Sequence, residues 1–376
     1  MTTDLIKNMY RHDLESFARF SFQALYPRTE FQDNWHLSVL AEALTRAESG
    51  QTRSLIINLP PRMLKSFYTS IVLPAWILGR DPYKKLLCLH HGNTLGQSLH
   101  ESCLQLMTSP RYRSIFSHTI IKEHPKRFTT SFGGGRQYMA IHDRLTGLGA
   151  DYIIIDDPIS AMDAQNDCER QRLNDQFDQN ILQRLNNKKS GVIILVMQRL
   201  HEHDLTAHLL AKNEKWELIN IPAIAFENEV WDLPQGRTHA RQKGEALHQS
   251  RESREQLLEI LTSIGGYAFA YQYLQGLYKP RFGVMDEGHV WLTPYREGEF
   301  WDARNSPQGA YGFIKFQESE LIQWKVFGIG EDLCPDNMRN SLTPEEFEIY
   351  AECVNQRAAA MHGDREKMMK ELLGDE

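Results

Sequence analysis

The sequence contains few cysteines, no long apolar run and no signal-peptide pattern. No apolar run approaches the roughly 20 residues of a membrane-spanning helix, and the N-terminus, MTTDLIKNMYRHDLESF, has no uninterrupted apolar stretch after a basic start. The cysteines form no C-x-x-C pair, which argues against a zinc site or a disulfide framework; they are Cys88, Cys103, Cys168, Cys334 and Cys353. We therefore expect a protein of a reducing cytoplasm with no membrane association.

The chain also has no general excess of basic charge, since its formal net charge is −7 at pH 7. Residues 281–376 contain 10 basic and 19 acidic residues, a net of −9, whereas residues 1–280 contain 32 and 30, a net of +2. Because an acidic segment repels phosphates, we expect any DNA contact in the first 280 residues. The aromatic-rich acidic segment is either a solvated surface, a part that packs on the rest of the chain, or a docking surface for another protein.

Apolar runs alternate with helical patterns over the first two thirds of the chain. Buried strands are predicted for residues 54–59, 85–91, 151–157, 191–197 and 216–222, with a hairpin around GGGR between residues 128 and 142. Helices are predicted at residues 4–27 (one or two), 31–50, 65–78, 94–107 and 167–184, and again from residue 343. This alternation is typical of an α/β protein with a mainly parallel sheet covered by helices on both faces.

The segment SLIINLPPRMLKSFYTSIVL places Lys65 and Ser66 between a predicted buried strand and an apolar helix. Phosphate binding at such a junction uses backbone N–H groups, a lysine that reaches the β- and γ-phosphates, and a hydroxyl that holds Mg²⁺. The loop lacks both glycines of the G-x-x-x-x-G-K-[ST] pattern, with Pro60 or Pro61 near the first and Leu64 at the second. We predict an ATP and Mg²⁺ site; the alternative is a lysine at the start of a surface helix.

Two adjacent carboxylates follow the apolar run in DYIIIDDP. Asp156 and Asp157 stand at the carboxyl end of a predicted buried strand, where ligands bind in open α/β sheets. Asp156 is the candidate to hold Mg²⁺, and Asp157 to act as the general base that polarises the attacking water. Adjacent carboxylates are costly without a cation, which favours a metal site over the alternative of a solvated turn before Pro158.

Four segments in this order resemble a known family: WHLSVLAEAL, IINLPPRMLKS, LTGLGADYIIIDDPIS and VMQRLHEHDLTAHLL. Over about residues 15–280 the chain is similar to the ATPase half of phage terminase large subunits, including prophage and gene-transfer-agent relatives. The resemblance implies a P-loop NTPase fold of the RecA/ASCE type. It also implies a helical N-terminal segment at residues 1–45 and an ATPase domain at 46–280. Residues 281–376 depart from the family, whose members carry an RNase H-like nuclease domain there, and we expect a small irregular or helical appendage in its place.

The resemblance assigns roles around the phosphate loop. Gln32 matches a glutamine that contacts adenine, although an ordinary polar helix start explains it equally well. Arg62 matches an arginine that stabilises charge on the γ-phosphate during hydrolysis, for which a guanidinium is suited; the alternative is a surface arginine. The implied nucleotide-binding loop comprises Pro61, Arg62, Met63, Leu64, Lys65 and Ser66.

Further segments match less specifically. Gln198 corresponds to a sensor of the γ-phosphate in the family's coupling motif. The segment from His91 to Asn93 falls where relatives link the nucleotide state to the grip on DNA. Arg199 and Asp204 fit an R-x-x-x-x-D-L pattern, for which a structural salt bridge and a catalytic role both stay open. Many relatives carry Glu where this chain has Asp157, a departure that would slow hydrolysis.

The family resemblance implies an Mg²⁺-dependent ATPase that moves double-stranded DNA into a phage-like capsid in a bacterial host cell. Its expected partners are the portal protein, the small terminase subunit and further copies of itself in a ring on the portal. A two-metal nuclease needs converging carboxylates, and the acidic pairs after residue 280 stand in loop-like contexts: Asp286, Glu287, Glu331 and Asp332. We therefore expect no DNA cleavage by this chain alone, and a separate nuclease subunit is a candidate partner.

Two alternatives remain from the sequence. One is a nucleic-acid-dependent P-loop ATPase of helicase type that acts in repair or phage defence, although residues 281–376 are too few for a second RecA-like lobe. The other is a catalytically impaired protein that keeps the fold for interaction. The retained Lys65, Ser66, Asp156 and Asp157 argue against the second alternative.

Overall fold

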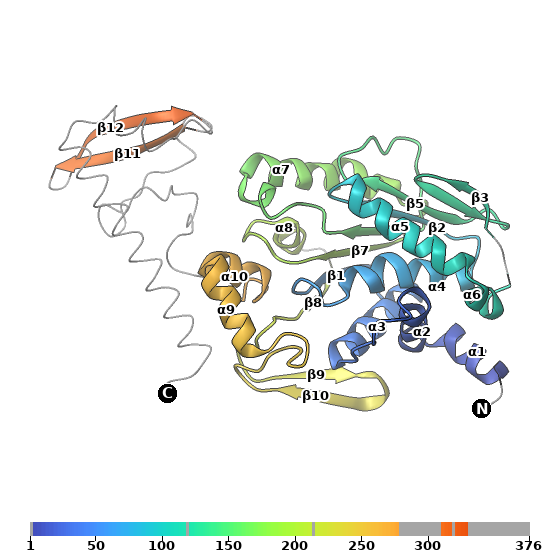
Figure 1. Cartoon of the computed structure of the whole chain (residues 1–376). Helices are drawn as coiled ribbons and strands as arrows, with labels where there is room; N and C mark the ends of the chain where they lie inside the picture. Colours follow the sequence, from blue (N-terminus) through green and yellow to red (C-terminus); the bar gives the residue numbers. More distant parts are fainter. Residues whose placement is uncertain (1–2, 118–119, 213–214, 278–309, 318–319, 330–376) are drawn as a thin grey trace. The chain divides into compact units, whose positions relative to one another are not determined.

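The computed structural model divides the chain into two compact units (Figure 1). The first comprises Met1–Leu257 and Ala270–Tyr278, and the second comprises Leu258–Phe269 and Lys279–Glu376. The first unit contains the main sheet. The structure describes residues 3–117, 120–212, 215–277, 310–317 and 320–329.

The centre of the first unit is an eight-stranded sheet in the order β3-β4-β5-β2-β6-β7-β1-β8. The six strands from β5 to β8 in that order are parallel, and β4 and β3 extend the sheet as antiparallel strands. They span Ser54–Asn58 (β1), Lys85–His90 (β2), Ile120–His124 (β3), Arg127–Thr130 (β4), Gly135–Ala140 (β5), Tyr152–Asp156 (β6), Val192–Met197 (β7) and Glu217–Asn220 (β8). One strand, β7, separates β1 from β6, which is the strand order of RecA/ASCE P-loop folds.

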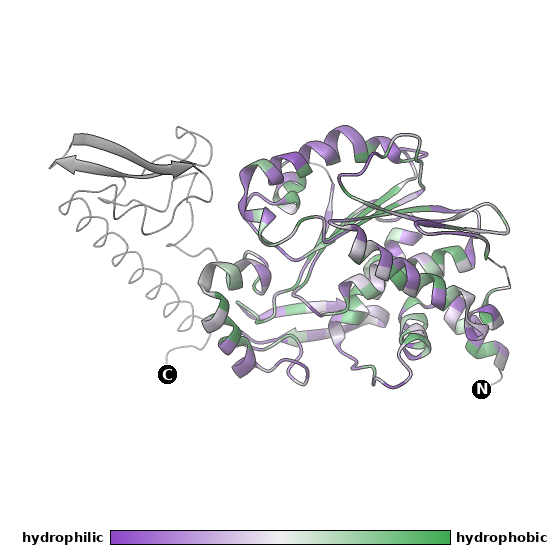
Figure 2. Cartoon of the chain, turned by 45° about the horizontal axis from the view of Figure 1, so that its top comes forward, coloured by the Kyte–Doolittle hydropathy of each residue, from purple (hydrophilic) through white to green (hydrophobic). Residues whose placement is uncertain are grey.

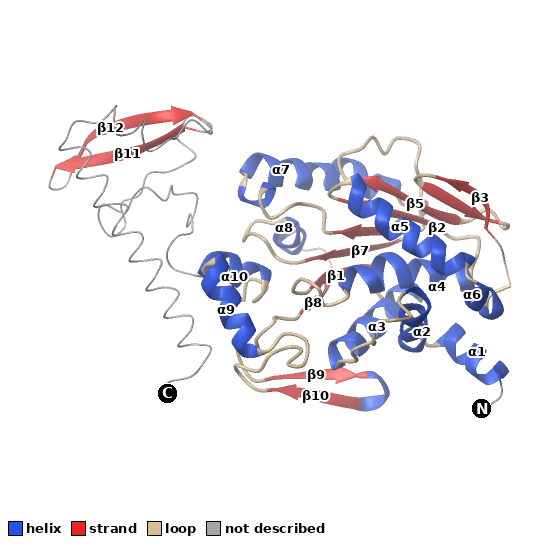
Figure 3. Ribbon diagram, viewed as in Figure 1, coloured by secondary structure: helices blue, strands red, loops and turns tan. Residues whose placement is uncertain are grey.

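Helices cover both faces of this sheet (Figure 3). The α-helices are Thr3–His12 (α1), Leu14–Leu25 (α2), Trp35–Glu48 (α3), Leu73–Arg80 (α4), Asn93–Thr108 (α5), Pro110–Ile115 (α6), Asp167–Gln176 (α7), Leu205–Ala211 (α8), Arg254–Ile264 (α9) and Gly266–Gln272 (α10). Two π-helical segments, Phe67–Val72 before α4 and Phe177–Ile181 after α7, continue these helices, and short 3-10 segments lie at Asp163–Gln165, Leu182–Arg184 and Pro234–Gly236. Two separate hairpins are formed by β9 (Glu229–Leu233) with β10 (Arg237–Arg241), and by β11 (Ala310–Gln317) with β12 (Glu320–Ile329).

The core consists of two apolar layers, one on each side of the strands. On one side, alternate strand residues such as Leu55, Ile57 and Ile154 pack with α2, α3, α4 and α5. On the other side, neighbours such as Ile56 and Ile155 pack with α7 and α8. Figure 2 shows hydrophobic colouring along the central strands, whereas α7 is largely hydrophilic. Strands buried on both faces explain why the sequence shows continuous apolar runs instead of strict alternation.

The α/β fold with a mainly parallel, helix-covered sheet is confirmed, and every predicted strand is present. The structure adds elements that the sequence did not predict: β3, the β9–β10 hairpin and the β11–β12 hairpin. The last of these lies inside the segment expected to be irregular or helical. The helix predicted at residues 167–184 ends as α7 at Gln176 and continues in π and 3-10 geometry. The helix predicted from residue 343 lies outside the described residues.

No helix among the described residues combines the length and the apolar character that crossing a bilayer requires.

Five of the described histidines lie in the interior of the first unit: His248 and four whose pKa is strongly lowered. His36, His90, His100 and His201 are each at most 6% exposed. Burial is the main cause that lowers the pKa of each to about 3. These side chains are therefore neutral in the folded protein at physiological pH.

Acidification is expected to remove the stability that these histidines provide. The folded-state pKa is depressed, so this contribution is complete above about pH 6.5 and is lost as the pH falls toward 3. Each histidine then costs roughly 1 kcal/mol per pH unit in free energy of unfolding. Urea unfolding at about pH 7.5 and 5 measures the effect, and His100→Asn, which cannot take up the proton, should show a shallower pH dependence than the wild type. Equal pH dependence of the two proteins would contradict this account.

Candidate functional site

The loop after β1 has left-handed backbone at two residues. The φ angles of Arg62 and Leu64 are 62° and 60°. The backbone N–H groups of Leu64, Lys65 and Ser66 donate to no acceptor among the described residues. Free N–H groups in such a turn, at the start of a helix, form a concavity that binds anions. The loop therefore has the backbone of a phosphate site although it contains no glycine.

Leu64 stands where the G-x-x-x-x-G-K-[ST] pattern has its second glycine. A left-handed φ costs a residue with a β-carbon about 1–3 kcal/mol and is characteristic of functional sites. The Leu64 side chain is half-buried and packs against the apolar layer that includes α2 and α3. This packing offsets the strain, so the departure from glycine is compatible with an open phosphate loop.

The two carboxylates at the end of β6 meet the loop residues directly. Asp156 is fully buried, and its Oδ1 accepts a hydrogen bond from Ser66 Oγ at 2.9 Å. Its Oδ2 accepts one from Ser70 Oγ at 2.6 Å. Asp157 has a left-handed φ of 45°, and its Oδ2 lies 3.1 Å from Lys65 Nζ. The structure thus brings together four residues that the sequence placed in one site from positions about ninety residues apart.

The electrostatics of this cluster favour an additional cation. Burial raises the pKa of both Asp156 and Asp157, and the nearby Lys65 ammonium only partly opposes the effect. The backbone N–H of Gln198 also hydrogen-bonds Asp157 and acts in the same direction as the lysine. One buried and one partly exposed carboxylate share one directly paired cation among the described residues, which is the situation that a divalent metal relieves.

Three further residues that the sequence assigned to the site are Gln198, Arg62 and Gln32. Gln198 follows β7, and its side-chain Oε1 is buried without a hydrogen-bond donor among the described residues. Arg62 is exposed, and its charge lowers the pKa of Glu252, which burial raises. Gln32 is exposed between α2 and α3, with its backbone hydrogen-bonded to His248. The predicted adenine contact of Gln32 thus remains a prediction.

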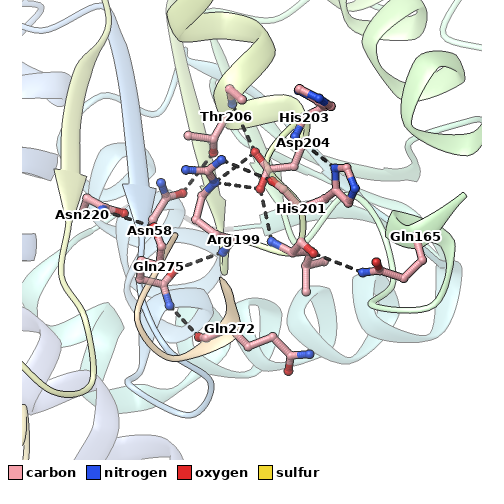
Figure 4. Close-up of polar contacts among 12 residues, drawn as sticks. Asn58, Gln165, Arg199, His201, His203, Asp204, Thr206, Asn220, Gln272 and Gln275 are labelled. Atoms are coloured by element: carbon pink, nitrogen blue, oxygen red, sulfur yellow. Dashed lines mark hydrogen bonds and ion pairs between the residues drawn. The ribbon is translucent and has the colours of Figure 1, made fainter. Parts of the chain in front are cut away.

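A second polar network lies beside the loop that follows β7 (Figure 4). Arg199 Nε contacts both carboxylate oxygens of Asp204, at 2.7 and 3.0 Å, and Asp204 is 1% exposed. The backbone N–H of Arg199 donates to Gln275 Oε1 at 3.0 Å. Thr206 Oγ1 donates to Asn58 Oδ1 at 3.1 Å, which ties α8 to the end of β1. The R-x-x-x-x-D-L pattern therefore forms a salt bridge in this structure.

Removal of the Asp204 charge is expected to destabilise the fold. Besides the Arg199 pair, the Asp204 carboxylate accepts the backbone N–H of Leu200 and, as the cap of α8, that of Ala207. Asp204→Asn should lower the free energy of unfolding by about 3–5 kcal/mol, because it leaves a buried guanidinium unpaired. Asp175→Asn, in an exposed position on α7, is the control and should change it by less than about 0.5 kcal/mol. Equal stability of both variants in urea would show that the ion pair contributes little.

Two residues of the site were not predicted. Ser70 binds Asp156 from the helix that follows the loop. Its spacing of four from Ser66 puts both hydroxyls on one helix face, a signal that the sequence did contain. Arg136 of β5 is fully buried and donates to the Ser70 carbonyl at 3.2 Å. Nothing local to Arg136 in the sequence indicates this contact. The acidic pairs Asp286–Glu287 and Glu331–Asp332 lie outside the described residues.

No protein-family model matches the sequence, and no curated protein matches it. Among solved structures, the chain is similar to the HK97 bacteriophage large terminase, with a TM-score of 0.35 and 12% identity over 53% of this chain. The match spans 41% of the length of that terminase. A likeness of this extent carries no argument about function, which has to come from the geometry of the site.

Proposed function

We propose that this protein is an Mg²⁺-dependent ATPase of the P-loop type. The observation that carries the proposal is the direct contact between the loop and the carboxylates. Ser66 binds Asp156 at 2.9 Å, and Lys65 binds Asp157 at 3.1 Å, beside three free backbone N–H groups. A lysine at the start of a surface helix would not have this environment, since the Lys65 side chain is only 8% exposed.

The residues present fit a magnesium–nucleotide complex. The free N–H groups and Lys65 would bind the phosphates, and Ser66 and Asp156 would hold Mg²⁺. Among the described residues no three His, Cys, Asp or Glu side chains make a complete metal site. That agrees with Mg²⁺ chemistry, in which phosphate oxygens and water complete the shell. When bound, Mg²⁺ neutralises charge that develops on the phosphates.

The remaining side chains have distinct tasks. Asp157 would accept a proton from, or orient, the attacking water once Lys65 has turned to the phosphates. The buried, unpartnered Oε1 of Gln198 is available to contact that water or to sense the terminal phosphate. Arg62, exposed at the loop, would stabilise charge on the γ-phosphate. Gln32 is proposed to contact adenine.

We further propose that the ATPase is the motor subunit of a DNA-packaging terminase. The order of the motifs along the chain supports this proposal, together with the near-neutral charge of residues 1–280, which leaves room for a local DNA-binding track. Portal protein, a small terminase subunit, a ring of identical copies and a separate nuclease subunit are the partners that such a motor would have. A nucleic-acid-dependent ATPase of helicase type is the competing interpretation.

The experiment is ATP turnover by the full chain with Mg²⁺, with and without double-stranded DNA, and with portal protein. A packaging motor should show Mg²⁺-dependent turnover that double-stranded DNA and the portal stimulate. Stimulation by single-stranded nucleic acid, with strand separation, would favour the helicase interpretation. Absence of Mg²⁺-dependent nucleotide binding would overturn the ATPase assignment.

A further inference from the structure

Arg136 is an unusual residue because its charge is buried without a carboxylate in direct contact. Its side chain is fully buried, and none of the described residues forms an ion pair with it within 4.0 Å. Nη1 lies 2.9 Å from His100 Nδ1, and Nη2 donates to the backbone carbonyl of Ser70 at 3.2 Å. Burial, followed by the charge of Arg136, lowers the pKa of His100 to about 3, so the neutral ring accepts this hydrogen bond.

The contact with Ser70 has a local cause in the helix after the phosphate loop. Pro74 has no backbone N–H, so the carbonyl four residues earlier, that of Ser70, has no donor in α-helical geometry. The helix adopts π geometry over Phe67–Val72, just before this proline. Arg136 supplies a donor for the freed carbonyl from the neighbouring sheet. It thereby fixes the segment of helix that carries Ser66 and Ser70.

The same segment holds the carboxylate assigned to the metal. The Ser70 hydroxyl donates to Asp156 Oδ2 at 2.6 Å, and the Ser66 hydroxyl donates to Oδ1 at 2.9 Å. The charges match as well, because the buried Asp156 and the partly exposed Asp157 are balanced by two buried cations, Lys65 and Arg136. Lys65 contacts Asp157 directly, whereas Arg136 acts on Asp156 through Ser70.

We propose that Arg136 is a positioning residue for the metal site, which holds Ser70 and Ser66 against Asp156 through its hydrogen bond to the Ser70 carbonyl. The inference rests on the proposed function, since it concerns the same Mg²⁺–nucleotide site. It predicts that loss of Arg136 impairs the use of Mg²⁺ more than it impairs the binding of nucleotide. A guanidinium that only filled space in the core would affect neither selectively.

The test compares full-length Arg136→Met and Arg136→Lys with a matched control, Arg241→Met. Arg241 is also fully buried and donates to the carbonyl oxygens of Pro222 and Glu245, and it pairs with Glu229. A fluorescent ATP analogue is titrated with EDTA and over a range of Mg²⁺ concentrations. Unfolding in urea is measured for each variant.

Arg136→Met should raise the Mg²⁺ concentration needed for half-maximal nucleotide binding by about 10–100-fold. The affinity for the nucleotide in EDTA, where Mg²⁺ is not available, should change by less than about twofold, which is small compared with the expected Mg²⁺ effect. Arg136→Lys should restore part of the Mg²⁺ response, because it keeps the charge and a donor. Arg241→Met should lose stability with a wild-type Mg²⁺ response. If Arg136→Met does not fold, Ser70→Ala, which removes the next link to Asp156, carries the same expectation.

A wild-type Mg²⁺ response in Arg136→Met, or in Ser70→Ala where Arg136→Met does not fold, would overturn the positioning role while the proposed function stands. An equal shift in Arg241→Met would also overturn it, because the effect would then be general destabilisation. If the wild-type protein shows no Mg²⁺-dependent binding, the proposed function itself fails, and the two failures are thus distinguishable.

Discussion

Lys65→Ala is expected to reduce ATP turnover by at least about 100-fold and to weaken nucleotide binding. Among the described residues the lysine is the one cation that pairs directly with the carboxylate cluster, at 3.1 Å from Asp157, and it stands among the free N–H groups of the loop after β1. Turnover by released phosphate and binding of a fluorescent ATP analogue measure the two effects. Lys188→Ala, at an exposed lysine bonded only to Gln183 among the described residues, is the control and should behave as the wild type.

Lys65→Ala should also change how the free energy of unfolding depends on pH, which a general loss of stability would not do. Burial already raises the pKa of Asp156 and Asp157, and removal of Lys65 raises both further. A carboxyl whose folded pKa is raised loses stability as the pH rises from its unfolded value, about 4, through its folded value. The deficit of Lys65→Ala in free energy of unfolding relative to the wild type should therefore grow once the pH exceeds the raised wild-type values and level off above those of the variant. If the difference in free energy of unfolding between Lys65→Ala and the wild type were the same at every pH, Lys65 would not compensate the negative charge of these carboxylates.

Asp157→Asn is expected to abolish hydrolysis while nucleotide binding is retained or tightened. Turnover should fall by about 10²–10⁴-fold, as for loss of a general base. Binding should tighten because Lys65 is released from its ion pair and one negative charge next to the phosphates is removed. Single-turnover hydrolysis and equilibrium binding of Mg²⁺ with an ATP analogue measure the two effects separately.

The control for this variant lies at the other end of the same strand. Asp151 directly precedes β6 and accepts hydrogen bonds from the Lys85 backbone and the Asn186 side chain, far along the strand from the phosphate loop. Asp151→Asn should retain full turnover. If Asp157→Asn hydrolyses ATP at the wild-type rate, another residue is the general base. If Asp157→Asn no longer binds the nucleotide, the carboxylate has a structural role.

The sequence predicted the strands of the sheet well because their signal is local. Runs such as YIII and VIILV are buried on both faces and are unambiguous, as is the carboxylate pair that ends one of them. The unpredicted strand β3 is a short edge strand, IIKEH, whose pairing with β4 depends on the neighbouring hairpin and not on its own pattern. The strand β11 shows alternation in YGFIKFQ, a local signal that the expectation of an irregular segment did not take into account.

The residues of the site also divide into those that the sequence could predict and those that it could not. Lys65, Ser66, Asp156 and Asp157 were predictable, because the carboxyl end of a parallel strand and the start of the next helix always meet at one edge of the sheet. Arg136 was not, since its contact with Ser70 joins residues 66 positions apart through a proline-induced gap in a helix. The left-handed φ of Leu64 was likewise hidden, because side-chain packing and not residue type permits it.

The first compact unit is discontinuous in sequence, and this sets where the protein can be cut. Ala270–Tyr278 belongs to it although the residues just before do not. Tyr273 accepts the backbone N–H of Ala223 at 2.7 Å, and Gln275 accepts that of Arg199 at 3.0 Å. A shortened protein that ends at Leu257 would leave both donors without these acceptors. A fragment that keeps the first unit intact therefore has to retain residues up to 277, and a chimaera that exchanges the C-terminal segment has to be joined after that point.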